Sequence, residues 1–288
     1  MVRVGLLHPG EMGAAVGRVL LANGHTVSWA AEGRSAASRA RADAAGLHAV
    51  ATVATLLASV DIVISLCPPG AALELATDVA ALGFAGTYAD ANAVSPALAR
   101  EIAGVIEAAG GSFVDGDVIG GPPVPGSGTR VYFSGQGADR LAQMLDPFGV
   151  DLGPDPTAAS ALKMCYAAWT KGTWALLAAL RAVALELGVE DTLLAEWERS
   201  QPGLAERSER AATTNARKAW RFAPELAYIA DTFESVGLPG GFARAASEVY
   251  RRLDGFKDVT DPPLADVLAA LTRPAETAAL PRPAEPAG

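Results

Sequence analysis

The opening stretch Val2–Gly24 constrains the fold most, because it has the order apolar strand, glycine-containing turn and amphipathic helix. The apolar run Val2–Leu7 is typical of a strand, and His8–Gly13 form the turn. The helix is expected over Ala14–Asn23 and is ended by Gly24. A helix N-terminus placed in this way offers unpaired N–H groups and a partial positive charge, so the order suits a phosphate-binding site.

The turn matches the dinucleotide-binding pattern G-x-G-x-x-G only in part, because His8 stands at the first glycine. Gly10 leaves room for the backbone to approach a pyrophosphate, and Gly13 lets the helix and the strand pack closely. A tight turn without a ligand would use the same glycines, but the strand before it and the helix after it favour dinucleotide binding. The residues expected to hold the cofactor at this turn are His8, Pro9, Gly10, Glu11 and Met12.

Strand and helix patterns alternate through the first half of the chain. Alternation of this kind predicts a parallel sheet with helices on both faces. We therefore expect an α/β fold: a Rossmann-type doubly wound parallel sheet followed by an all-helical domain. The expected strands are Arg3–Leu7, Thr26–Ala30, Ile62–Leu66, Thr87–Ala89, Ser112–Asp115 and Arg130–Ser134. The helices between them are expected over Ser38–Ala45, Ala71–Leu82 and Pro96–Ala109, the last with Ser95 as its N-cap.

Strand patterns end near Pro156, and the rest of the chain has helical patterns. The expected helices are Ala158–Leu187, Val189–Ser200, Leu204–Phe222, Pro224–Val236, Phe242–Leu253 and Pro263–Leu271. Pro224 is expected at a helix start, where its missing N–H costs little. The Gly- and Pro-rich segment at residues 150–157 predicts a domain boundary. We expect a cofactor domain over residues 1–156, a helical domain for substrate binding and dimerisation over 157–271, and a disordered tail over 272–288.

Composition and charge narrow the class of protein. Half of the 288 residues are hydrophobic and 19% are charged, as in soluble globular proteins. The net charge of -9 argues against a nucleic-acid partner and, more weakly, against an anionic membrane surface. The most apolar long segment, Ala158–Leu187, contains four charged residues. We therefore expect it to be a buried helix and not a membrane span.

The chain has two cysteines, Cys67 and Cys165, which are far apart in apolar contexts. This spacing predicts neither a metal cluster nor a disulfide framework. No signal-peptide pattern precedes the first expected strand. We expect a protein of the reducing cytoplasm.

The residues after the second expected strand bear on the choice between NAD and NADP. Glu32 follows Gly13 by about the 20 residues expected for an acidic ligand of the NAD ribose. Arg34 and Ser35 come next, and a guanidinium with a hydroxyl suits the 2′-phosphate of NADP. Alternatively, Ser35 only caps a helix whose arginines lie on its solvated face. We expect NADP, with NAD as the alternative.

Lys163 differs from the other basic residues, because the positive charge of this chain is nearly all arginine. The four lysines are Lys163, Lys171, Lys218 and Lys257, and Lys163 has apolar neighbours on both sides. Burial in an apolar environment favours the neutral form of a lysine, which can then exchange a proton near neutral pH. Alternatively, the side chain extends its ammonium into water. Lys171 is rotated by about 80° from Lys163 on a helix and does not share its face.

Five segments resemble the motifs of the β-hydroxyacid dehydrogenase family, which includes 6-phosphogluconate and 3-hydroxyisobutyrate dehydrogenases. Gly5–Gly13 is similar to G-F-I-G-L-G-x-M-G, and Asp90–Pro96 to D-x-S-T-x-S-P. Ile64–Pro69 is similar to the strand and loop near the nicotinamide, and Asp115–Gly121 to the substrate-binding D-A-P-V-S-G-G. Lys163 falls on the catalytic lysine of the K-x-x-N-N helix. The resemblance reaches to about residue 260.

The resemblance implies further site residues at the motif positions. It implies cofactor contacts from Leu66, Cys67, Pro68 and Asn92. It implies substrate contacts from Ser95, Ile119, Gly120 and Gly121. The glycine pair could form an anion-binding nest for a carboxylate or could simply end a strand; we favour the nest.

Three departures from the family motifs fall at expected substrate-binding and catalytic positions. Ile119 replaces the substrate-binding serine, and Tyr166 and Ala167 stand at the two Asn positions of the K-x-x-N-N motif. Tyr166 could supply a hydroxyl to catalysis, whereas Ala167 lacks the usual amide. Lys218–Phe222 and Gly237–Pro239 resemble a divergent branch of 6-phosphogluconate-dehydrogenase-like proteins whose substrate is unassigned.

These observations together predict an NAD(P)-dependent oxidoreductase with Lys163 as the general acid and base. The expected substrate is a small carboxylic acid with a hydroxyl or ketone. One alternative is an NADPH-dependent imine reductase, and a second is a non-catalytic NADP-binding sensor. We also expect a homodimer, in which the apolar helical faces around Trp169, Trp174, Leu176, Leu177 and Leu180 supply the contact area.

Overall fold

The computed structural model describes residues 1–257 and 259–272. The chain forms two compact units, of which the first comprises Met1–Ala167 with Asp231–Gly240. The second comprises Ala168–Ala230 and the chain from Gly241 onward. The expected boundary after residue 156 differs from this division, which passes through the long helix α7 (Ala158–Glu186). The expected tail lies outside the described residues except for Thr272, which ends a helix.

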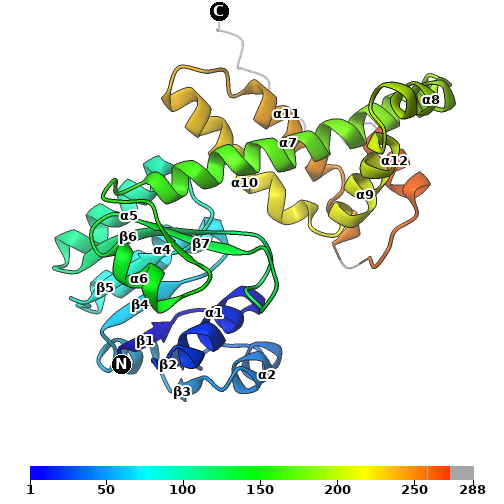
Figure 1. Cartoon of the computed structure of the whole chain (residues 1–288). Helices are drawn as coiled ribbons and strands as arrows, with labels where there is room; N and C mark the ends of the chain where they lie inside the picture. Colours follow the sequence, from blue (N-terminus) through cyan, green and yellow to red (C-terminus); the bar gives the residue numbers. More distant parts are fainter. Residues whose placement is uncertain (258, 273–288) are drawn as a thin grey trace, which may run out of the picture. The chain divides into compact units, whose positions relative to one another are not determined.

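The first unit contains one eight-stranded sheet in the order β3-β2-β1-β4-β5-β6-β7-β8 (Figure 1). This order confirms the expected doubly wound sheet, because the chain proceeds outward from β1 in both directions. The strands are β1 (Arg3–Leu6), β2 (Thr26–Ala30), β3 (His48–Val50), β4 (Ile62–Ser65), β5 (Thr87–Asp90), β6 (Ser112–Ile119), β7 (Arg130–Ser134) and β8 (Gly149–Asp151).

The sheet is parallel from β3 to β6, but β7 pairs antiparallel with β6. β8 then pairs parallel with β7. The expectation of a wholly parallel sheet was wrong for these last two strands. The connection from β6 to β7 contains no helix, and a parallel link would need a longer crossover.

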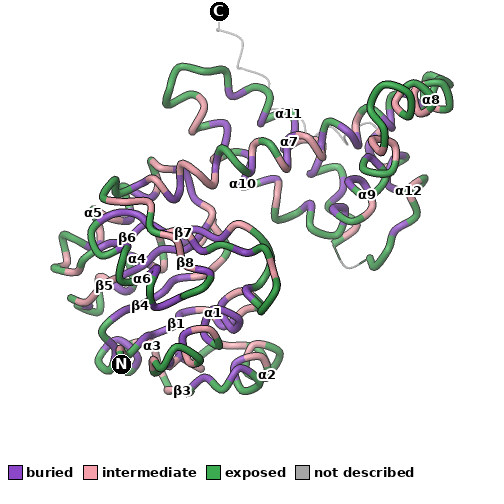
Figure 2. The backbone as a smooth tube through the Cα atoms, viewed as in Figure 1, coloured by how far each residue is buried: buried purple, intermediate pink, exposed green. Residues whose placement is uncertain are grey.

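Helices cover both faces of the sheet, and each face has its own buried cluster. Leu6, Ile64 and Leu141 belong to the cluster under α1 (Glu11–Ala22), α2 (Ala36–Ala44) and α6 (Ala138–Met144). Leu7, Val63 and Ile102 belong to the cluster under α3 (Val53–Leu57), α4 (Ala72–Ala81) and α5 (Pro96–Ala108). Neighbouring residues point to opposite faces, so the central strands are buried on both sides (Figure 2).

The second unit is built from helices. Besides most of α7 it contains α8 (Glu190–Ser200), α9 (Leu204–Ala216), much of α10 (Ala219–Ser235), α11 (Gly241–Arg251) and α12 (Leu264–Thr272). Lys171 is buried here and forms an ion pair with Glu225. No helix of the described chain is long and apolar enough to cross a membrane.

The expected break between two helices at residue 223 was wrong. α9 ends at Ala216 and α10 begins at Ala219, so Pro224 lies inside α10. Its ring removes the hydrogen bond that an N–H at this position would donate to the carbonyl of Trp220. The proline is tolerated close to the start of the helix but does not mark it.

Candidate functional site

The predicted site residues follow four neighbouring strands at their carboxyl ends. His8–Met12 follow β1, Leu66–Pro68 follow β4, Asn92 and Ser95 follow β5, and Ile119–Gly121 end β6. These strands are adjacent in the order β1-β4-β5-β6 and run in the same direction. Their carboxyl ends therefore meet at one edge of the sheet, and β1 and β4 flank the point where the strand order reverses. Ligands of open α/β sheets bind at such points.

The turn after β1 has the features of a phosphate cradle. A Cβ atom at Gly13 would lie 2.2 Å from the carbonyl oxygen of His8, so only glycine fits there. A Cβ atom at Gly10 would meet nothing within 4 Å, which leaves space beside the start of α1. Gly10 gives α1 no side-chain cap, and Ala14 donates to the Gly10 carbonyl oxygen at 2.9 Å. The N–H groups that precede Ala14 in this helix have no partner within it, so the turn fits a pyrophosphate.

His8 and Arg34 lie close together beside this turn. Burial, with a smaller contribution from the charge of Arg34, lowers the pKa of His8 to about 4. The imidazole is therefore neutral at pH 7. Burial also lowers the pKa of Arg34, which remains charged. His8 Nδ1 and Arg34 Nε are buried, and neither atom has a hydrogen-bond partner within the described chain. This is expected of groups that contact an anionic ligand.

The other residues near Arg34 are committed to the local fold. Ser35 caps α2 by accepting from the N–H of Ser38 at 3.2 Å. Arg39 donates to the carbonyl oxygens of Ala31 at 2.6 Å and Arg34 at 3.3 Å. Arg34 is therefore the basic side chain best placed to bind a phosphate at this corner.

Asn92 joins the loops that follow β4 and β5. Its amide donates to Ser65 Oγ at 2.9 Å and to the Asp90 carboxyl, while its oxygen accepts from the Cys67 N–H at 2.6 Å. Burial and the charge of Asp90 raise the pKa of Cys67 to about 11. The Cys67 thiol is therefore neutral at pH 7.

Asp90 and Asp115 are buried side by side in the sheet. Their Cα atoms are register partners on β5 and β6, and the residues are 0% and 1% exposed. Burial raises the pKa of Asp115 to about 6, with a further contribution from Asp117. Burial, with the charges of Asp115 and Asp117, raises the pKa of Asp90 well above its usual range.

Asp115 fixes the start of α7 on the sheet. Its two carboxylate oxygens accept from the Ser160 N–H at 2.8 Å and the Ser160 hydroxyl at 2.5 Å. The neighbouring N–H of Ala159 donates to Ser134 Oγ at 3.0 Å. A carboxylate at a helix N-terminus satisfies free N–H groups and complements the helix dipole. The position of the first turns of α7 is thus set by β6 and β7.

Lys163 lies one turn further along α7 and reaches the end of β6. Its Nζ atom is 2.8 Å from Asp117 Oδ1 and 2.6 Å from the carbonyl oxygen of Val118. The two charged side chains are 14% and 3% exposed. The lysine is shielded from solvent, so its ammonium does not extend into water. The expected apolar surroundings of the amine differ from this contact, because a carboxylate lies against Nζ and favours its charged form.

The remaining predicted residues occupy different environments. Ser95 is the N-cap of α5 and accepts from the Leu98 N–H at 3.2 Å, as predicted. Gly120 has φ +119 and lies against Thr129, whose hydroxyl donates to the carbonyl oxygen of Gly121 at 2.9 Å. Tyr166 is 46% exposed, one turn beyond Lys163.

Sequence reasoning missed Asp115 and Asp117 as functional groups. Both lie within a strand that is buried along most of its length. Because buried carboxylates need partners, their spacing of two residues indicated a polar contact on one face of the strand. That signal was present in the sequence.

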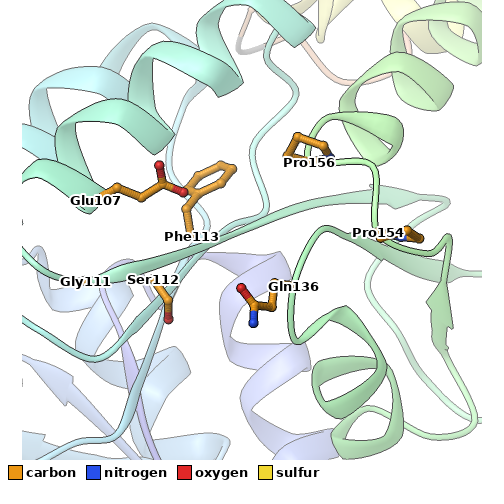
Figure 3. Close-up of a pocket in the computed structure, with 7 residues that line it drawn as sticks. All are labelled: Glu107, Gly111, Ser112, Phe113, Gln136, Pro154 and Pro156. Carbon is orange, nitrogen blue, oxygen red and sulfur yellow. The ribbon is translucent and has the colours of Figure 1, made fainter.

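A surface pocket with a defined lining lies elsewhere (Figure 3). It has a volume of about 320 Å³ and sits at the amino end of β6, which begins at Ser112. None of the predicted site residues lines it. The lining residues are Glu107, Gly111, Ser112, Phe113, Gln136, Pro154 and Pro156. The residues of the described chain contain no group of three or more His, Cys, Asp or Glu side chains arranged to hold a metal.

Two domain families match this chain. Residues 3–151 match the NAD binding domain of 6-phosphogluconate dehydrogenase. Residues 184–253 match a domain of unknown function, DUF1932. An uncharacterized 28.5 kDa protein of Methanothermus fervidus is 30% identical over 196 residues, which cover 67% of this chain and 75% of that protein.

Solved structures share the fold over nearly the whole chain. A conserved protein of unknown function, described as structurally similar to 3-hydroxyacid dehydrogenases, has 28% identity and a TM-score of 0.68 over 88% of this chain and 97% of its own. Mycobacterium tuberculosis 3-hydroxyisobutyrate dehydrogenase has 19% identity and a TM-score of 0.69 over 95% and 100%. An imine reductase from Bacillus cereus has 19% identity and a TM-score of 0.54 over 93% and 98%. The match over residues 3–151 confirms the resemblance that the motifs indicated. The chain belongs to the β-hydroxyacid dehydrogenase-like family, with the NAD-binding domain of 6-phosphogluconate dehydrogenase.

Proposed function

We propose that the protein transfers a hydride between a nicotinamide cofactor and a small hydroxy or keto acid, with Lys163 as the general acid and base. The observation that carries this proposal is the position of the lysine amine. Lys163 Nζ is largely shielded from solvent and held at the end of β6, and β1, β4, β5 and β6 end at one edge of the sheet. The same edge carries the glycine turn that fits a dinucleotide pyrophosphate.

The chain's own residues bind the reactants and move one proton. The nicotinamide, when bound, supplies or accepts the hydride. The start of α1 and Arg34 hold the cofactor phosphates, and neutral His8 packs beside them without adding charge. In reduction, the Lys163 ammonium donates a proton from Nζ to the carbonyl oxygen of the substrate. In oxidation, the neutral amine accepts the hydroxyl proton.

Ser95 and the end of β6 are our proposed substrate-binding elements. Ser95 is 4% exposed and already accepts one hydrogen bond as a helix cap. Gly121 has open space where a side chain would stand, so its backbone is accessible to a carboxylate. Ile119 offers an apolar contact in place of a hydroxyl, which favours a substrate with an apolar group at that point.

We further propose that NADP is preferred over NAD, because Arg34 is a half-buried cation whose buried Nε has no hydrogen-bond partner within the described residues. Arg34→Ala should lower the affinity for NADPH at least about tenfold, equal to 1.4 kcal/mol, and leave the affinity for NADH nearly unchanged. Arg39→Ala is the matched control, because Arg39 binds backbone carbonyls. Equal losses for both cofactors in Arg34→Ala would contradict the preference.

An imine reductase is the second candidate function. Ala167 is 1% exposed and supplies no amide to the site, while Tyr166 adds a hydroxyl one turn from Lys163. A tyrosine hydroxyl can protonate an imine nitrogen as hydride arrives at carbon. The absorbance of NADPH at 340 nm, followed with a panel of β-keto acids, β-hydroxy acids and cyclic imines, separates the two functions. Saturable NADPH binding without turnover of any of these would favour a non-catalytic sensor.

We also propose a homodimer, because α7 carries exposed apolar side chains within the second unit. Trp169 is 67% exposed, and Leu176, Leu180 and Val183 are 40–54% exposed. Their spacing of seven, four and three residues forms one stripe along the helix. Leu177 was expected to belong to this surface, but it is buried within its own unit and does not contribute to it.

A further inference from the structure

The end of β6 and the first turns of α7 are joined by two parallel polar contacts. Asp115 binds Ser160, and Asp117 binds Lys163. Residues two apart on a strand point to the same face, and residues three apart on a helix lie on the same side. When Ser160 of α7 binds Asp115, Lys163 is therefore placed opposite Asp117.

The contact between Asp117 and Lys163 is shielded from water. Asp117 is 3% exposed, and its Oδ1 atom accepts from the Lys163 ammonium at 2.8 Å and from the Val118 N–H at 2.6 Å. Both hydrogen bonds favour the ionised carboxylate. A poorly hydrated carboxylate and ammonium in contact attract each other strongly, and removal of either leaves a buried uncompensated charge.

The other ionisable groups around the pair also favour the ammonium. Asp115 and Asp90 lie on β6 and β5, and the charge of Asp117 raises the pKa of both carboxyls. From α7 itself, Cys165 and Tyr166 are exposed. No arginine or histidine follows β5 or β6 within the described residues 90–95 and 112–121. The acidic groups that β6 brings near Lys163 Nζ are therefore Asp117, in contact with it, and Asp115, while β7 places Arg130 as the register partner of Ile119.

We infer that Asp117 is a positioning residue that fixes Lys163 Nζ at the end of β6 and keeps it protonated, so that Lys163 is poised as a proton donor for reduction. The inference rests on the proposed function of Lys163. The aligned family motif D-A-P-V-S-G-G has proline where this chain has Asp117. A proline has no ionisable group, so the motif by itself does not provide this contact.

The chain's small number of lysines allows a direct test without turnover. Protein labelled with ¹³C,¹⁵N-lysine has four side-chain signals, and the exposed Lys218 and Lys257 serve as internal references. The signal of Lys163 is assigned from Lys163→Arg. In the unaltered protein its titration midpoint should equal or exceed those of Lys218 and Lys257. A midpoint more than one pH unit below theirs would overturn the inference.

Substitution of Asp117 should shift this titration. Asp117→Asn should lower the Lys163 midpoint by about 1–3 pH units, the range for loss of an adjacent opposite charge. Asp117→Glu should restore it, and Asp117→Ala is a second neutral variant with less bulk. An unchanged Lys163 midpoint in both neutral variants would overturn the inference.

Kinetics separate the inference from the proposed function. With a substrate from the panel, the loss of reductive activity with rising pH should move to lower pH in Asp117→Asn, because the ammonium is lost earlier. If Lys163→Arg retains full activity, the proposed role of Lys163 fails while the titration result stands. If Lys163→Arg is inactive and the pH profile of Asp117→Asn is unmoved, the positioning role of Asp117 fails alone.

Discussion

Gly10 and Gly13 stand in the same turn for different physical reasons. Gly13 is required by packing, because a methyl group there would overlap the carbonyl oxygen of His8. Gly10 has φ -69 and open space around it, so its conformation suits any residue. The missing side chain at Gly10 therefore leaves space for the proposed ligand, and the missing side chain at Gly13 allows the helix to pack against the turn.

This difference predicts opposite effects of two alanine substitutions. Gly13→Ala should lower the free energy of unfolding by about 1–3 kcal/mol, the usual cost of overpacking. Gly10→Ala should leave that free energy within about 0.5 kcal/mol of the unaltered protein but weaken NADPH binding at least about tenfold. Chemical denaturation and fluorescence titration measure the two quantities. Equal stabilities of the two variants would contradict the packing argument.

Asp115 predicts a pH dependence of stability. Its pKa of about 6 in the folded protein lies above the value of 3.8 for a free aspartate, so the folded state binds the proton more tightly. The resulting stabilisation is present below pH 4 and is lost as the pH rises through 6. A shift of this size corresponds to about 2–3 kcal/mol.

Asp115→Asn removes this dependence. Its free energy of unfolding, relative to that of the unaltered protein, should rise by about 2 kcal/mol between pH 4.5 and pH 7. Urea denaturation at several pH values measures the difference. Asp139→Asn, at an exposed position on α6, is the control. Its free energy of unfolding should change with pH in the same way as that of the unaltered protein. Parallel curves for Asp115→Asn would refute the assignment.

At the residue scale the sequence singled out Lys163 and the glycine turn but not the carboxylate that contacts the lysine. Lys163 and the glycine turn are recognisable because each has an unusual local context. The ion pair between Lys163 and Asp117 joins residues 46 apart in the chain. Its existence depends on how α7 is seated on β6, which local periodicity does not determine. The sequence alone therefore did not show that a carboxylate contacts Lys163.

At the scale of elements, Ser95 shows how one side chain fixes a helix start near the site. Its hydroxyl caps α5, and Pro96 follows at the first helical position. Ser95→Ala should lower the free energy of unfolding by about 1 kcal/mol, whereas Ser95→Thr should retain most of it. Denaturation at pH 7 tests both variants. A stable Ser95→Ala protein would show that the cap does not stabilise α5.

The long elements could be predicted from the sequence, and the short ones could not. The helices α1, α5 and α7 show many turns of periodicity, so their bounds were within three residues of those observed. β3 and β8 have three residues each, and α3 has five. Such segments contain too few alternations to distinguish a strand from a turn, and sheet pairing decides their conformation.

At the scale of the whole molecule, the proposed dimer depends on the exposed apolar stripe of α7. Leu176→Asp with Leu180→Asp should convert a dimer to a monomer, because two charges would be buried in each copy of the interface. Light scattering at micromolar concentration measures the mass. Leu82→Asp is the control, since Leu82 is 50% exposed but lies in the first unit. A monomeric mass for the unaltered protein would contradict the proposal.

The central claim is that Lys163 donates the proton during reduction. Single-turnover reduction of a substrate from the panel by NADPH tests this claim most directly. Lys163→Arg keeps the positive charge beside Asp117 but cannot exchange a proton near neutral pH. The rate of NADPH oxidation in this variant should fall by about 10²–10⁴-fold, with unchanged NADPH affinity and with Lys218→Met as an unaffected control. A rate in Lys163→Arg equal to that of the unaltered protein would contradict the account.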